Sequence, residues 1–133
     1  QAILDRFIRD AIELQRHGIG VVAISSNDAV SYPEDAFPEM VNLAQARSFP
    51  FPYLYDESQS VARAYDAVCT PDFFGFNRAL ELQYRGRLDA SGRNPAPPDA
   101  TRELFSAMLA VATTGIGPRT QTPSIGCSLK WKS

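Results

Sequence analysis

Two kinds of hydrophobic spacing alternate along this chain, and their order limits the folds that it can adopt. Residues 2–17 carry paired apolar positions at helical spacing, whereas residues 19–25 form a continuous apolar run typical of a strand buried on both faces. The same reading predicts further helices at 38–47, at 58–65 and after Asp99, and strands at 53–56, 73–76 and 80–86. The predicted order is α, β, α, β, α, β, β, α. This order favours an α/β fold whose central mixed sheet has helices on both faces and ends in an antiparallel hairpin.

The length and composition indicate one domain followed by a tail. The chain has 133 residues, of which 44% are hydrophobic and 21% charged, so it can bury a core without disulfides or metals. The last predicted helix ends near Gly115, and prolines and glycines then interrupt any regular pattern. We therefore predict a domain over residues 1–115 and a C-terminal tail over residues 116–133.

The charge balance excludes several classes of partner. The formal net charge is −2, which favours neither a nucleic acid nor an anionic membrane surface. No apolar run approaches the roughly 18 residues that span a bilayer, and no signal peptide is visible. We expect a cytoplasmic protein, with the periplasm left open because the sequence begins at Gln1.

Cysteine is scarce in this sequence. Cys69 and Cys127 are the only two, and they do not form a Cys-x-x-Cys pair. With His17 as the single histidine, a zinc site lacks ligands, so we predict neither a metal nor another cofactor. The simplest interpretation of each cysteine is a small packed side chain.

A proline at the start of an aromatic run is the most distinctive local feature. Cys69, Thr70 and Pro71 directly precede the predicted strand at 73–76. Because proline has no backbone N–H to donate, it fits the first residue or the edge of a strand. The neighbouring thiol and hydroxyl make this position a candidate for chemistry.

Seven segments, in order, resemble a known family. The chain is similar to a peroxiredoxin-like branch of the thioredoxin fold, in the alkyl hydroperoxide reductase and thiol-specific antioxidant superfamily. The segments are GVVAISSND (20–28), YPED (32–35), FPYLYDESQ (51–59), VARAY (61–65), CTPDFF (69–74), YRGRLD (84–89) and GCSLKW (126–131). The resemblance implies a thioredoxin-like fold and a redox function based on thiols.

The redox motif of that family has no counterpart among these residues. The family places a Cys-x-x-Cys pair at the N-terminus of its first helix, after a central strand, where the helix dipole stabilises a thiolate. In this sequence, that position precedes Gln1. We therefore expect an N-terminally incomplete domain, in which the strands at 19–25 and 73–76 flank a missing first strand. A less favoured alternative is that another segment or another chain fills the gap.

The resemblance also assigns candidate site residues. It implies a cis peptide bond before Pro71 and a role for Thr70 and Pro71 in binding the substrate. Cys69 is then a candidate catalytic thiol in a resolving or auxiliary role. The alternative is that Cys69 only packs against its neighbours and takes no part in the chemistry. Cys127 is a candidate auxiliary thiol. A disulfide between them requires Cα atoms within roughly 7 Å, which the sequence leaves open.

Two functions from different classes follow from the resemblance. The first is an antioxidant enzyme, a thiol–disulfide oxidoreductase or peroxidase, that acts on a protein or small-molecule disulfide or on a peroxide and is regenerated by a thiol reductant. Residues 1–133 alone are then expected to be inactive. The second is a redox-inactive thioredoxin-like module that binds a protein or peptide at the face around Pro71. A homodimer is a further expectation.

Overall fold

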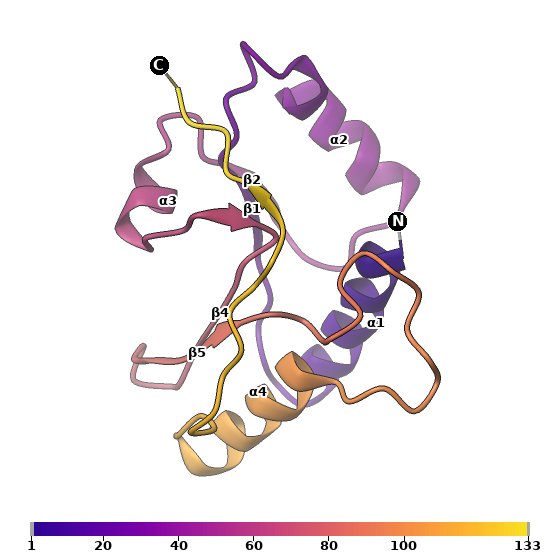
Figure 1. Cartoon of the computed structure of the whole chain (residues 1–133), viewed down its shortest axis with the longest axis vertical. Coiled ribbons are helices and arrows are strands. Elements are labelled where there is room, and N and C mark those ends of the chain that lie inside the picture. Colours follow the sequence, from indigo (N-terminus) through magenta and orange to yellow (C-terminus); the bar gives the residue numbers. More distant parts are fainter. Residues whose placement is uncertain (1, 133) are drawn as a thin grey trace. The chain divides into compact units, whose positions relative to one another are not determined.

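The computed structural model describes residues 2–132, which fall into two compact units (Figure 1). The first unit combines Gln1–Gly20 with Cys69–Cys127, and the second combines Val21–Val68 with Ser128–Ser133. Each unit is therefore built from two stretches that are distant in the sequence.

The first unit contains two long helices and a β-hairpin. Helix α1 spans Ala2–Arg16, and Gly18, at a φ of 78°, follows it in the left-handed conformation that glycine adopts readily. Strands β4 (Phe73–Phe76) and β5 (Leu82–Gly86) pair antiparallel, as predicted, with an irregularity between Gly75 and Phe76. Helix α4 (Glu103–Thr114) packs against this hairpin and against α1.

The core of the first unit forms between these elements. Helix α1 contributes Ala11 and Leu14, and its Phe7 ring packs against Phe73 in a tilted arrangement with ring centroids 5.3 Å apart. The other buried side chains come from β5, the segment after it and α4: Tyr84, Leu88, Leu104, Ala107, Met108 and Val111. Burial of apolar surface on this scale is the main force that holds the helices against the hairpin.

The second unit is a small α/β layer. Strands β1 (Ala23–Ser25) and β2 (Tyr53–Tyr55) pair in parallel, and α2 (Phe37–Ala46) contacts β2. A short 3₁₀ helix, η1 (Pro33–Asp35), precedes α2, and α3 (Ser60–Ala64) follows β2. The buried apolar side chains are Met40, Phe51, Ala62 and Leu129.

A buried amide organises the interior of the second unit. The Gln59 side chain is fully buried, and its Nε2 donates to the Ser26 and Lys130 carbonyls at 2.7 and 2.8 Å. Its Oε1 accepts from the Lys132 amide at 3.0 Å. Because a buried amide is costly unless it is hydrogen-bonded, these contacts fix residues 130–132 on this unit.

The elements agree with the predicted order, although several boundaries differ. Strand β1 begins at Ala23, not at residue 19, because its partner β2 has only three residues and is preceded by Pro52. The helix after Asp99 begins at Glu103, and Arg102 occupies its N-cap without a side-chain hydrogen bond. Asp99 lies before this N-cap, so it does not cap the helix.

Two short strands were not predicted. Strand β3 (Cys69–Thr70) pairs with β6 (Cys127–Ser128), which lies within the predicted tail. The fold class is confirmed as a mixed α/β structure with parallel and antiparallel pairs. Within residues 2–132, these pairs form three two-stranded ladders.

No helix between residues 2 and 132 combines the length and the apolar character that crossing a bilayer requires. In the same range, His, Cys, Asp and Glu side chains nowhere gather in a group of three that is suited to hold a metal ion.

Candidate functional site

The peptide bond between Thr70 and Pro71 is cis, as the resemblance implied. Pro71 is exposed and lies between β3 and β4, so the two strands position it from either side. Cys69 and Thr70, the other two residues of the motif, are half-buried on β3. The structure therefore groups these three residues at one strand end, and the fourth predicted site residue, Cys127, lies on β6, the strand that pairs with β3.

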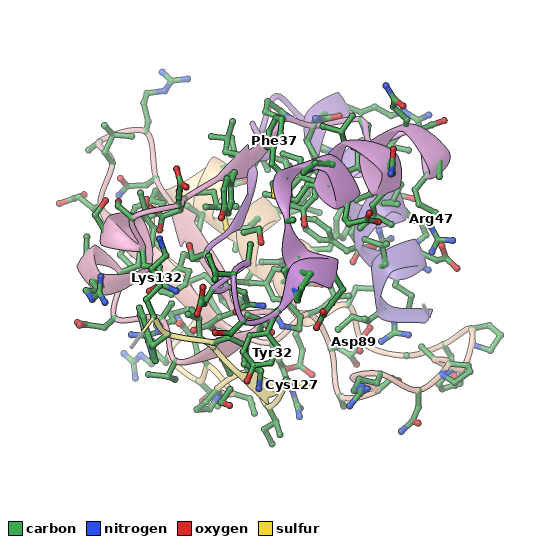
Figure 2. The ribbon with its side chains drawn as sticks, turned by 90° about the horizontal axis from the view of Figure 1, so that it is seen from above. Tyr32, Phe37, Arg47, Asp89, Cys127 and Lys132 are labelled. Carbon is green, nitrogen blue, oxygen red and sulfur yellow. The ribbon has the colours of Figure 1, made fainter. Side chains whose placement is uncertain are left out.

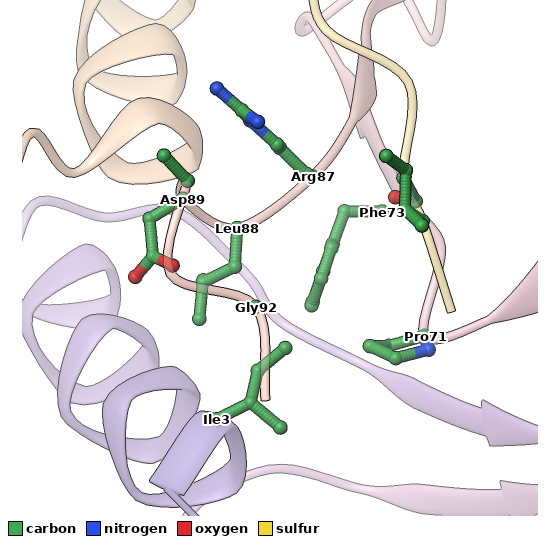
Figure 3. A pocket seen from close by; sticks show the side chains of 10 residues that line it. Ile3, Pro71, Phe73, Arg87, Leu88, Asp89 and Gly92 are labelled. Carbon is green, nitrogen blue, oxygen red and sulfur yellow. The ribbon is translucent and has the colours of Figure 1, made fainter. Parts of the chain in front are cut away.

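A cavity of about 80 Å³ opens beside Pro71 (Figure 3). Ile3, in the first turn of α1, lines this cavity together with Pro71 and Phe73. The remaining lining comes from two later segments: Arg87, Leu88, Asp89, Ala90 and Gly92 after β5, and Ser124 and Ile125 before β6. The N-terminal end of α1 and Pro71 thus border the same small space.

A buried ion pair fixes one side of the cavity. Arg6 of α1 binds Asp89 in a bidentate manner, with Nε–Oδ2 at 2.7 Å and Nη2–Oδ1 at 3.0 Å. The same guanidinium donates to the carbonyls of Gly92 at 2.6 Å and Asn94 at 2.8 Å. Burial alone would raise the pKa of Asp89, but the hydrogen bonds and charge of Arg6 hold it below its usual value. The segment after β5 is thereby fastened to the start of α1.

A second ion pair involves Arg87, which also lines the cavity. Arg87 binds Glu103 through two contacts of 3.0 Å. Buried Tyr84 donates its hydroxyl to the Arg87 carbonyl at 2.6 Å, and burial raises its pKa to about 12. Tyr84 is therefore a neutral hydrogen-bond donor at physiological pH.

The surroundings of Cys69 favour a protonated thiol. Its Sγ lies 3.6 Å from the Ser124 carbonyl, to which it donates. Burial, and then the negative charge of Asp72, raise the pKa of the Cys69 thiol above its usual value. Asp72 is itself paired with Arg85 at 3.5 Å. Because the thiolate is the nucleophile in redox chemistry, this environment does not activate Cys69.

Cys127 lies at the molecular surface on β6 (Figure 2). It is a free thiol, and so is Cys69. Although their strands pair, the two sulfurs are not joined in this structure.

The segment that leads into β6 lies against the Thr70–Pro71 peptide. A Cβ atom placed on Gly126 would overlap the Thr70 carbonyl oxygen. Ser124 donates its hydroxyl to the Gly86 carbonyl at 2.6 Å. The sequence reasoning missed Gly126, Ser124 and Asp89 as site residues. The only advance signal was that Asp89 and Gly126 belong to segments that carry the family resemblance.

A second hollow of about 280 Å³ lies beside the proline-rich segment that precedes α4. Arginines line it, but they are already paired: Arg6 with Asp89, and both Arg9 and Arg102 with the buried carboxylate of Asp10. The smaller cavity at Pro71 is therefore the better candidate for chemistry.

Two solved structures resemble this chain closely. A protein of Geobacillus kaustophilus, described as an uncharacterized conserved protein, shares 48% identity with a TM-score of 0.88. The match covers 98% of this chain and 69% of that one. A hypothetical protein of Sinorhizobium meliloti 1021 shares 39% identity, also with a TM-score of 0.88, over 99% of this chain and 72% of that one.

A search of curated proteins gives no significant match. The model of the AhpC/TSA family matches residues 1–87, which include α1, both strands of the second unit, Pro71 and the hairpin. Residues 1–87 make up more than half of the 133 residues. The chain therefore belongs to the AhpC/TSA family.

Proposed function

We propose that the protein is a thiol-dependent oxidoreductase, a peroxidase or a disulfide reductase, whose substrate binds at the Pro71 cavity. The observation that carries this proposal is the shared lining of that cavity by Ile3, in the first turn of α1, and by Pro71. A helix N-terminus carries a partial positive charge, which stabilises a thiolate next to it. A thiol placed at this end of α1 would face Pro71 across the cavity.

The attacking thiol in this proposal belongs to a Cys-x-x-Cys pair that precedes Gln1. Neither Cys69 nor Cys127 belongs to such a pair, and the surroundings of Cys69 raise its pKa. Thr70 and Pro71 border the substrate, while Cys69 contributes packing next to them. Cys127 is exposed and remains available as an auxiliary thiol.

In the proposed peroxidase reaction, an external thiol reductant supplies the two electrons that reduce the peroxide. The thiolate attacks the terminal oxygen of the hydroperoxide and the O–O bond breaks. The leaving alkoxide takes a proton from water and departs as an alcohol, or as water when the substrate is hydrogen peroxide. The resulting sulfenic acid condenses with the second thiol of the pair to form a disulfide and water. An external dithiol then returns two electrons and two protons by thiol–disulfide exchange. With a disulfide substrate, the thiolate attacks sulfur, and the second thiol resolves the mixed disulfide.

The test compares two proline variants of the natural polypeptide that contains residues 1–133. Pro71→Ala changes the lining of the cavity and is expected to lower kcat/KM by about 10- to 100-fold, because small displacements at a reacting centre are costly. Consumption of hydrogen peroxide and of a low-molecular-weight disulfide, with dithiothreitol as the reductant, provides the measurement.

The matched control is Pro118→Ala, an exposed proline outside this cavity, which should leave both rates unchanged. Absence of turnover with either substrate class in the unmodified protein would contradict the proposal. It would favour the alternative, a redox-inactive module that binds a partner at the Pro71 face.

A further inference from the structure

The backbone edge of β3 next to Pro71 is already occupied by the chain itself. Strand β6 pairs with β3, and Gly126 lies so close that a Cβ on it would overlap the Thr70 carbonyl oxygen. Two residues earlier along the chain, the Val68 carbonyl accepts from the Leu129 amide at 3.0 Å. The edge that a bound polypeptide would use is therefore taken.

Strand geometry explains why the C-terminal segment covers the backbone of Thr70 as well as that of Val68. In an extended strand, backbone groups of alternate residues point to the same edge. Val68 and Thr70 are alternate residues, and both carbonyls face the C-terminal segment. An added substrate strand needs these same groups, because main-chain hydrogen bonds give this mode of recognition its affinity.

Side-chain contacts hold the C-terminal segment in place on both sides of β6. Before the strand, Ser124 donates to the Gly86 carbonyl at 2.6 Å. After it, the Lys130 amide donates to Asn27 Oδ1 at 2.9 Å, and Gln59 binds the backbone of residues 130 and 132. Leu129 is buried. Displacing β6 therefore requires breaking several partly buried hydrogen bonds and the packing of Leu129 together with the strand pairing.

We propose that residues 124–128 determine the specificity of the Pro71 site by excluding extended polypeptides from the β3 edge. This inference rests on the proposed function, and it restricts the substrates to molecules that reach the cavity without pairing along β3. The cavity of about 80 Å³ has room for only a small group. The family match ends at residue 87, so this determinant lies outside the part of the chain that the family model covers.

The experiment measures binding, so it does not depend on turnover. The probe is the insulin B chain with its cysteines carboxymethylated, an extended polypeptide that cannot exchange disulfides. Binding to the natural polypeptide that contains residues 1–133 is followed by fluorescence anisotropy, and the Thr70 amide is followed by NMR. Gly126→Ala should force β6 away from Thr70, and Gln59→Met should release residues 130–132.

Gly20→Ala is the matched control, because a Cβ at Gly20 meets nothing within 4 Å. We expect no saturable binding to the unmodified protein or to Gly20→Ala. Gly126→Ala and Gln59→Met should each bind saturably and at least about tenfold more tightly than the upper limit of affinity measured for Gly20→Ala, the gain that one or two backbone hydrogen bonds supply.

Two results would overturn the inference. One is saturable binding to the unmodified protein with a shift of the Thr70 amide. The other is faster amide exchange at Thr70 in both variants with no gain in binding over Gly20→Ala. A missing redox activity is detected separately, in the peroxide and disulfide assays of the unmodified protein.

Discussion

Arg6 and Asp89 form the ion pair on which the geometry of the Pro71 cavity depends. The side chains are 9% and 4% exposed, and the guanidinium also binds two carbonyls of the segment after β5. Removing one partner of such a pair leaves a buried charge without compensation, which costs far more than losing an exposed pair. The cavity is therefore sensitive to a residue that does not line it, Arg6.

Asp89→Asn should lower the free energy of unfolding near neutral pH by about 3 kcal/mol and weaken its acid dependence. The pKa of Asp89 is below 3.8 in the folded protein. The stabilisation is thus fully present above the unfolded-state value of 3.8 and is lost as the pH falls through the lower folded value. Urea unfolding at a series of pH values measures both effects.

Glu103→Gln is the control for this prediction. Its pair with Arg87 is more exposed, at 24% and 29%, so the cost should stay within about 1 kcal/mol. Equal costs for the two variants, or an unchanged acid slope in Asp89→Asn, would contradict the assigned role of the Arg6–Asp89 pair.

The β4–β5 hairpin and α4 meet at a glycine. A Cβ on Gly75 would overlap the Met108 sulfur of α4, and it would lie 3.4 Å from Tyr84 Cβ. Gly75 therefore sets how closely the helix approaches the hairpin. The irregularity in the strand pairing falls at the same residue, between Gly75 and Phe76.

Gly75→Ala should destabilise the protein by about 1–3 kcal/mol, the usual cost of overpacking a core. In a Met108→Ala background the methyl group has room, so the added cost of Gly75→Ala should largely disappear. Urea unfolding of the two single variants and the double variant gives the interaction energy. Additive costs would show that the two residues do not compete for the same space.

The elements that the sequence predicted well are those with a sustained period. Helix α1 has several turns of paired apolar positions, and β5 alternates over its length, so the spacing alone places them. Strands β3 and β6 have two residues each, too few for any period to be visible. Their pairing joins residues far apart in the chain, which local patterns do not report.

The candidate site likewise contains residues that the sequence predicts and residues that only the structure brings together. Cys69, Thr70 and Pro71 are adjacent in the sequence, so their shared location was predictable. Arg6 and Asp89 are 83 positions apart, and nothing in either segment points to the other. The contact of Gly126 with Thr70 likewise depends on the course of the tail, which no propensity encodes.

At the scale of the whole molecule, both compact units are assembled from distant stretches. The second unit includes residues 128–133 in addition to 21–68, and Leu129 is one of its buried apolar side chains. The fully buried Gln59 side chain makes two of its three hydrogen bonds with this C-terminal stretch. Residues 129–132 thus contribute to the interior of the second unit.

Deletion of residues 128–133 should therefore lower the free energy of unfolding by about 3 kcal/mol or more, the cost of removing a buried leucine and leaving buried polar groups without partners. Urea unfolding measures the loss, and limited proteolysis should give earlier cleavage within residues 21–68. As a control, Ile125→Ala alters an apolar side chain that is 87% exposed and should have little effect. An unchanged stability after the deletion would contradict this account.

The dependence of the second unit on residues 128–132 has a consequence during biosynthesis. A ribosome that has finished residue 68 must still translate all of 69–127 before Leu129 and Lys130 exist. At about 5–20 residues per second, this interval lasts roughly 3–12 seconds. During that time, the nascent second unit lacks the buried Leu129 side chain and two of the three partners of the Gln59 side-chain amide, so we expect chaperones that bind chains during translation to recognise it.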